Sequence, residues 1–456
     1  MLRQRGTPSH DRRQRTTLRR TTTVIGILAV TLLGGPCDGG GTTASSSSRI
    51  AAVPFDPAPD SARVDVAEPT RSRPTSITNP LFPVSKLAQV VQLGEDGGKP
   101  LRVEVTLLPD TKTIDWNGQK VETLVSQYVA YLDGRILEVA LDYFAQADDG
   151  SVWYFGENVD NYRNGRVVDH EGTWLAGKNG PPGMIMPANP KIGDVYRPEN
   201  VPGLVFEEVT VKSVNETVDG PRGPVKGAVL VQEHLMDGTI EDKAFAPGYG
   251  EFRARAGGEL VTVALAVPFD MLPGSPPAEL STLSSGAADI FDTASSNGWE
   301  RMSATLDTMA AAWRTHRAGG LPELLDAQMT GALNALAGAV DAQNPADVRQ
   351  AAVDLARAGL DLQLRHRPPA EVDLARLGLW ARQLLVDAAA TDSRAVAGDV
   401  AALTAIWSRV DHTIDASNAE SINAQLGELR AAADDVTAAA AAVPGLLKTL
   451  ADLQPA

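Results

Sequence analysis

The chain has 456 residues, which is enough for two or three domains, and 43% of them are hydrophobic. This composition is typical of a globular protein with ample material for a core. The formal net charge is −16, and an acidic surface repels phosphate backbones, so the composition argues against nucleic-acid binding. The single cysteine, Cys37, excludes a disulfide within the chain.

Residues 1–37 have the order of a bacterial lipoprotein export signal. Arginines dominate the start, an apolar run follows from 24 to 33, and small residues lead to Cys37. The apolar run is too short to span a bilayer of about 30 Å at about 1.5 Å per residue. A typical lipobox reads Leu-Ala-Gly before the cysteine and this chain has Gly-Gly-Pro, so cleavage near Ala44 is the alternative. We expect a lipid on Cys37 to anchor the protein to the extracytoplasmic face of the cell membrane, with secretion as the alternative.

Residues 38–78 are predicted to be a disordered tether, because they are rich in Gly, Ser, Thr, Pro and Asp and show no sustained periodicity. Residues 79–270 are predicted to form an antiparallel β meander, since apolar and polar residues alternate along runs such as 103–107 and 137–143. Asn-Gly and Asp-Gly pairs separate such runs and accept the positive φ of type I′ turns. We expect a sandwich or a partly open barrel, with the Gly- and Pro-rich segment 177–190 as a loop over one mouth or edge.

Three segments of this β-rich part resemble an uncharacterised family of exported and lipid-anchored bacterial proteins. The segments contain Trp-Tyr-Phe-Gly-Glu, Ile-Met-Pro-Ala-Asn-Pro and Ala-Pro-Gly-Tyr-Gly-Glu, and the resemblance covers about residues 79–255. It implies a β-rich domain of envelope proteins, and it brings no activity with it.

Residues 271–280 are predicted to be a linker, and residues 281–456 a helical bundle. Apolar residues recur three and four positions apart in six successive stretches, of which the first carries Trp299, Met309 and Trp313. The last stretch is expected to end before Pro444. Short connections between these stretches predict an antiparallel up-down bundle. The whole chain is therefore predicted to be an α+β protein of two domains, with a β meander followed by the bundle.

The usual catalytic signatures are missing from the sequence. It contains no Gly-x-Ser-x-Gly elbow, no phosphate-binding Gly-x-x-x-x-Gly-Lys followed by Ser or Thr, and no His-Glu-x-x-His. We therefore expect a non-catalytic protein without a cofactor. The enzyme alternative is a hydrolase of an envelope polymer that uses a carboxylate pair such as Glu157 and Glu171.

Consecutive aromatic residues at Trp153, Tyr154 and Phe155 must face both sides of their strand. Core packing is one interpretation. The other is that Trp153 and Phe155 form the floor of a site for a small hydrophobic ligand, with the 177–190 loop as its lid. Met184 and Met186 in that loop are candidate contacts to the same ligand, or to Cu(I).

Histidines occur near the ends of three predicted helices, as His316, His366 and His412. Alternate helices of an up-down bundle run parallel, so these imidazoles are expected at one pole, where they could ligate a transition metal. Arginines crowd the same ends, as expected of cations placed against helix C-terminal dipoles, and their charge opposes a metal. We therefore prefer a structural role and keep a metal-binding bundle as the alternative.

The leading expectation is a non-catalytic binding or interaction module of the cell envelope. Its expected partners are the membrane, through the lipid anchor, and a small hydrophobic ligand or another envelope protein.

Overall fold

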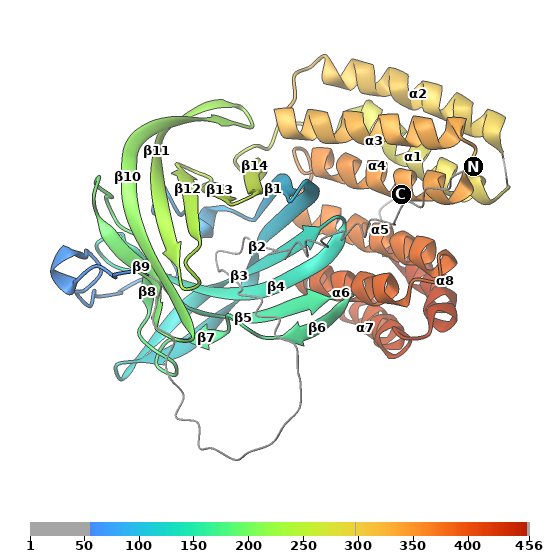
Figure 1. The fold of residues 1–456 in the computed structure, drawn as a ribbon. Coiled ribbons are helices and arrows are strands. Elements are labelled where there is room, and N and C mark those ends of the chain that lie inside the picture. The colour runs from blue at the N-terminus through green and yellow to red at the C-terminus, as the bar shows by residue number, and fades with distance from the viewer. Residues whose placement is uncertain (1–54, 297, 454–456) are drawn as a thin grey trace, which may run out of the picture.

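The computed structural model describes residues 55–296 and 298–453 (Figure 1). The expected export signal and Cys37 lie outside these residues. The described part of the expected tether, residues 55–78, packs on the sheet. Val64 donates a backbone hydrogen bond to Val195, and the Ser72 backbone and side chain donate to Asp148. These contacts hold the end of the expected tether against the β-rich part.

The β-rich part is one sheet of 14 strands. The strands are β1 Gln89–Asp96, β2 Lys99–Trp116, β3 Gln119–Leu132, β4 Arg135–Gln146, β5 Val152–Arg163, β6 Arg166–Asp169, β7 Trp174–Leu175, β8 Gly183–Met186, β9 Val195–Val201, β10 Val205–Gly220, β11 Gly223–Leu235, β12 Ile240–Ala246, β13 Gly250–Ala256 and β14 Glu259–Val267. Their order is β6-β5-β4-β3-β2-β1-β14-β13-β12-β11-β10-β9, and β7 and β8 pair with β5. Neighbouring strands are antiparallel, and the last strand, β14, returns to pair with the first. The sheet is strongly curled but open, which confirms the predicted antiparallel meander (Figure 1).

The predicted turns account for the tight hairpins. Asp133 and Gly134 have φ angles of 54° and 72°, and Asn164 and Gly165 have 53° and 72°. Both central residues of a type I′ turn need positive φ, which Asn, Asp and Gly adopt at the lowest cost. These local signals therefore produced correct hairpins between β3 and β4 and between β5 and β6.

The 177–190 segment differs from its expected loop structure, because it contains β8. This short strand pairs with β5 and lies against β9, so that a Cβ at Gly183 would be 1.8 Å from the carbonyl oxygen of Pro198. Only glycine permits this close approach of two backbones. Glycine at position 183 thus allows β8 to pack closely against β9.

Helices follow the sheet, and they form two groups beside it (Figure 1). Their bounds are α1 Ala278–Thr293, α2 Trp299–Arg317, α3 Glu323–Asp341, α4 Pro345–Gln363, α5 Pro369–Ala389, α6 Ser393–Val410, α7 Ala416–Ala431 and α8 Val436–Leu453. Helices α1–α4 pack against one another, α5–α8 pack against one another, and α4 contacts α5. An antiparallel sheet followed by helices confirms the predicted α+β class.

The last predicted helix is divided in two by the structure. Helix α7 ends at Ala431, and α8 begins at Val436 and continues through Pro444, where the prediction had placed its end. A proline inside a helix removes one hydrogen bond, and exposure of Pro444 lets water satisfy the carbonyl left without a donor. Helix α8 is long and apolar enough to cross a membrane, but core helices of soluble proteins meet the same criterion. In this structure α8 packs against α5 and α7.

The two faces of the sheet have different neighbours. Val129 and Tyr131 of β3 belong to a buried cluster with Trp380 of α5 and Val400 of α6. Tyr128 and Ala130, which alternate with them along β3, face the other way, into the curl, where they contact residues of β4, β5, β13 and β14. One face of β2–β4 is therefore covered by helices, and the other lines the interior of the curled sheet.

Candidate functional site

A cavity of about 530 Å³ lies between the covered face of the sheet and the helices. Its walls come from β1, β2 and β3 on one side and from α3, α4 and α5 on the other. The volume falls within the range of about 300–1,000 Å³ that small-molecule sites occupy. We call this space the interface cavity.

Small residues on α3 leave room for the interface cavity. Ala327, Gly331, Ala332 and Ala335 recur at helical spacing and line it together with Leu324. A Cβ built at Gly331 would meet nothing within 4 Å. Because these side chains are so short, α3 covers the opening without filling it.

The floor of the cavity is a buried network of ion pairs. Arg102 of β2 donates two hydrogen bonds to Asp361 of α4, at 2.6 and 2.7 Å. Arg376 of α5 reaches the same carboxylate at 2.9 Å and Asp373 at 2.7 Å. Burial by itself raises the pKa of Asp361, but the two guanidinium groups outweigh it, and the pKa lies below its ordinary value. The network therefore stays ionised and joins the sheet to the helices.

The same network is balanced in charge. Arg409 of α6 donates to Glu104 of β2 at 2.6 Å, so three buried arginines face Glu104, Asp361 and Asp373. At the rim, Arg357 pairs with Asp354 at 2.8 Å. A wall whose charges are paired in this way has little preference for an anion or a cation.

Three polar atoms of the lining residues have no hydrogen-bond partner among the described residues. They are the Tyr131 hydroxyl, the Gln328 Oε1 and the Arg376 Nε. Burial raises the pKa of Tyr131, so that its hydroxyl is neutral and can donate or accept. Buried polar groups are normally satisfied, and those that are not point to a missing ligand or water.

An aromatic wall stands beside these atoms. The rings of Tyr131 and Trp380 are stacked with centroids 5.4 Å apart, and the Arg357 guanidinium lies 5.2 Å from the Trp380 ring. The cavity thus combines aliphatic surface, a flat aromatic surface and unsatisfied hydrogen-bonding atoms. Sequence reasoning missed this site because its residues come from elements far apart in the chain, and only the small-residue spacing on α3 was a local signal.

The residues of the predicted aromatic site lie in one cluster, but their side chains are buried in the core of the β-rich part. Trp153 of β5 pairs with Met184 of β8, and Phe155 and Met186 are buried in the same core cluster. The Arg71 guanidinium lies 5.2 Å from the Trp153 ring and 5.1 Å from the Phe155 ring. Arg71 therefore covers part of the aromatic surface through cation–π contacts, the methionines pack in the core, and a space of about 400 Å³ lined by Trp153, Pro181 and Pro182 lies beside them.

The histidines are only partly gathered. His316 ends α2 and His366 follows α4, and they are close enough to affect each other electrostatically. Burial and the neighbouring Arg365 lower the pKa of both imidazoles. His412 is exposed and follows α6, in the other helical group. Within residues 55–296 and 298–453 no group of three or more His, Cys, Asp or Glu side chains could hold a metal ion.

Of the predicted carboxylate pair, Glu157 and Glu171, the first is buried inside the curled sheet. Glu157 of β5 is 0% exposed and forms no ion pair with a described residue, whereas Glu171 is exposed in the turn before β7. Gly172, the residue after Glu171, lies close to Glu157, since a Cβ built at Gly172 would be 3.4 Å from Glu157 Oε1. Burial and neighbouring carboxylates raise the pKa of Glu157 well above its ordinary value.

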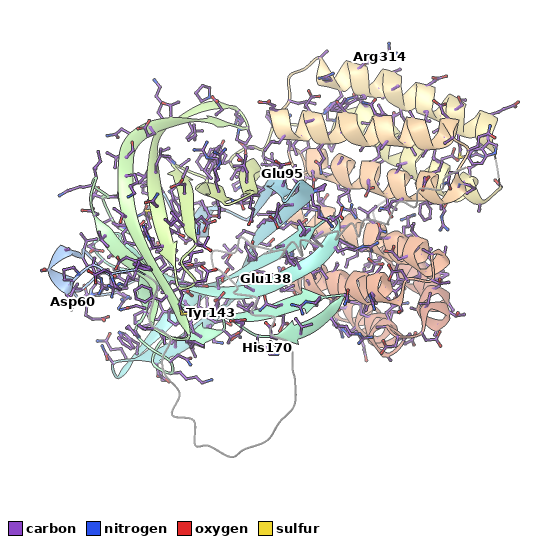
Figure 2. All side chains as sticks on the ribbon, in the orientation of Figure 1. Asp60, Glu95, Glu138, Tyr143, His170 and Arg314 are labelled. Atoms are coloured by element: carbon purple, nitrogen blue, oxygen red, sulfur yellow. The ribbon has the colours of Figure 1, made fainter. Side chains whose placement is uncertain are left out.

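Glu157 belongs to a set of carboxyl groups inside the curled sheet, which we call the carboxyl-lined interior. Its members are Glu138, Asp142, Glu157, Glu199, Glu207, Glu233, Glu241, Glu251 and Glu259. Figure 2 labels Glu138, which lies in the middle of the curled sheet. Lys243 lies between three of these carboxyl groups, 2.7 Å from Glu233, 3.3 Å from Glu241 and 3.5 Å from Glu251. The sequence signal for this set was that acidic residues on several strands lie at positions that share one face of the alternating pattern. Such a pattern does not say which face of the sheet is buried.

Comparisons with protein-family models, with curated proteins and with solved structures found no match to this chain. The site is therefore interpreted from its own geometry and chemistry.

Proposed function

We propose that the protein is an exported, lipid-anchored module of the cell envelope that binds a small organic ligand in the interface cavity without transforming it. The observation that supports this function is a cavity of about 530 Å³ whose lining includes polar atoms without partners. Export and anchoring rest on the sequence of residues 1–37, with secretion as the alternative.

The ligand is expected to be uncharged, with an apolar or aromatic body. The charged side chains of the lining are paired with one another, so a ligand charge would gain no free counterion. Contact with the aliphatic lining and with the aromatic side chains Tyr131 and Trp380 favours an apolar body. A hydroxyl, amide or carbonyl group on the ligand would satisfy Tyr131 and Gln328.

The same pairing favours binding over catalysis. The lining carboxylates Glu104 and Asp354 both accept hydrogen bonds from arginines, so neither is a free general base. For the metal-binding bundle, one runner-up function, no group of three or more candidate ligands is found among the described residues.

Binding can be tested with N-phenyl-1-naphthylamine, an uncharged aromatic probe whose fluorescence rises in apolar sites. We expect saturable binding to the wild-type protein. Gly331→Phe, which points a ring into the cavity, should weaken binding at least about tenfold, or about 1.4 kcal/mol. Gly338→Phe is the matched control, because Gly338 is also on α3 with no atom within 4 Å of a Cβ, and it does not line the cavity.

Two results would reject the proposal. One is equal probe binding by both phenylalanine variants. The other is native mass spectrometry and crystallographic soaking that find only ordered water in the interface cavity, because water alone would satisfy the polar atoms.

A further inference from the structure

Carboxyl groups of the carboxyl-lined interior lie directly opposite each other on neighbouring strands. Asp142 is opposite Glu157, Glu199 is opposite Glu207, and Glu233 is opposite Glu241. Like charges directly opposite in a sheet repel each other and destabilise the pairing. These positions are tolerable only when some of the carboxyl groups carry protons or when cations compensate them.

Compensation by cations is incomplete. Lys243 forms ion pairs with Glu233, Glu241 and Glu251. Asp142 accepts a 2.8 Å hydrogen bond from Tyr154, whose hydroxyl is neutral. Within the described structure both oxygens of Glu138 and one oxygen each of Glu199 and Glu207 have no hydrogen-bond partner, and Glu157 has beside it only the Tyr154 hydroxyl, which donates to Asp142. Tyr128 on β3, Tyr154 on β5, Tyr196 on β9 and Lys243 on β12 also face this interior, and Glu171 and Asp237 line a pocket with Glu199 and Glu207.

The carboxyl groups also lie on both sides of the seam where the curled sheet meets itself. Strand β8 pairs with β5 and contacts β9, and β5 and β9 also contact each other directly. Glu157 on β5 and Glu199 on β9 are close enough for each ionised group to oppose ionisation of the other. Repulsion between them therefore acts across the seam.

We propose that the carboxyl-lined interior is a proton-dependent latch, which holds the seam at β8 and β9 closed while its carboxyl groups are protonated and loosens it when they ionise. This inference goes beyond the proposed ligand binding and uses a different face of the sheet. The ligand that operates the latch is the proton, because no group of three or more described carboxylates is arranged to hold a metal ion, and the three that converge surround the Lys243 ammonium.

The direction of the pH dependence follows from linkage. Burial raises the pKa of Glu138 to about 8 and that of Asp142 to about 7. Burial and neighbouring carboxylates also raise the pKa values of Glu157, Glu199 and Glu207 well above the ordinary value. Such groups bind more protons in the closed state than in an open one, so the closed state weakens as pH rises from the ordinary glutamate pKa of about 4.5 through the raised values.

Hydrogen–deuterium exchange of the full-length protein tests the latch. Exchange is measured at about pH 5.5 and about pH 8.5 with a chelator present, and it is corrected for the pH dependence of the chemical exchange rate. We expect peptides covering 183–201 to exchange at least about tenfold faster at the higher pH, the effect of one pKa unit. Peptides from α5 should not change.

The variant Glu157→Gln with Glu199→Gln keeps both seam groups neutral at every pH, so most of the pH effect should disappear. Glu300→Gln with Glu420→Gln, two exposed helical positions, is the matched control and should behave like wild type. If the seam variant does not fold, infrared spectroscopy of the wild type reports the carbonyl band of protonated carboxyl groups, which should persist at neutral pH and fade by about pH 9.

Three outcomes would overturn the latch. These are equal protection of 183–201 at both pH values, a seam variant that responds to pH as wild type does, and no protonated carboxyl band at neutral pH. Restored protection at the higher pH on adding Ca²⁺ in place of the chelator would identify a cation site instead. Probe binding in the interface cavity is measured separately, so the two proposals can fail independently.

Discussion

Asp361→Asn provides the sharpest test of how the sheet and the helices are joined. The carboxylate of Asp361 is 0% exposed and accepts hydrogen bonds from Arg102 at 2.6 and 2.7 Å and from Arg376 at 2.9 Å. The asparagine has the same shape but no charge, and it leaves two buried guanidinium groups with one anion fewer. Removing one partner of a buried ion pair typically costs about 3–5 kcal/mol, because the remaining charge stays buried.

The expected loss is near the lower end of that range. Arg102 keeps Glu104 at 2.7 Å and Arg376 keeps Asp373 at 2.7 Å, so neither guanidinium is left alone. We therefore expect Asp361→Asn to lower the free energy of unfolding by about 3 kcal/mol, measured by urea unfolding with circular dichroism. Because the network joins β2 to α4 and α5, β-sheet and helix signals should shift together.

Asp354→Asn on the same helix is the matched control. Its side chain is 44% exposed and pairs with Arg357 near the surface, so the loss should be about 1 kcal/mol or less. Equal losses for the two variants would refute the reasoning, since burial would then make no difference. Separate unfolding of sheet and helices in the wild type would favour the independent domains expected from the 271–280 linker.

Gly183→Ala should lower the melting temperature strongly, because the new Cβ would be 1.8 Å from the carbonyl oxygen of Pro198. Gly258→Ala is the control and should change the melting temperature little, because the atom nearest to its Cβ is 3.9 Å away. Lys243→Met should destabilise the protein more at about pH 8 than at about pH 5.5 in urea unfolding, since the carboxyl groups it leaves behind can neutralise themselves only by binding protons; an equal loss at both pH values would contradict this. Mass spectrometry of the native N-terminus should find acylated Cys37, and a chain that begins near Ser45 without acyl mass would exclude the anchor.

Much of the architecture could be predicted from the sequence because its signals are local. Positive-φ pairs such as Asp133-Gly134 set the hairpins, and the stripe through Met309 and Trp313 marked α2, as the structure has it. These patterns depend on neighbours within a few residues, where backbone preference and side-chain spacing decide the outcome. The α+β class follows from the change of period between the two parts of the chain.

Long-range packing decided the rest. Alternation along β9 and β10 places Glu199 and Glu207 on one face, but it does not say whether that face is exposed or inside. Helices cover the opposite face of β2–β4, and the curl of the sheet then encloses the acidic one. The interface cavity likewise needs Gly331, Tyr131 and Trp380 to meet across three elements. Strand partners and enclosed faces depend on contacts between distant segments, which local preferences do not encode.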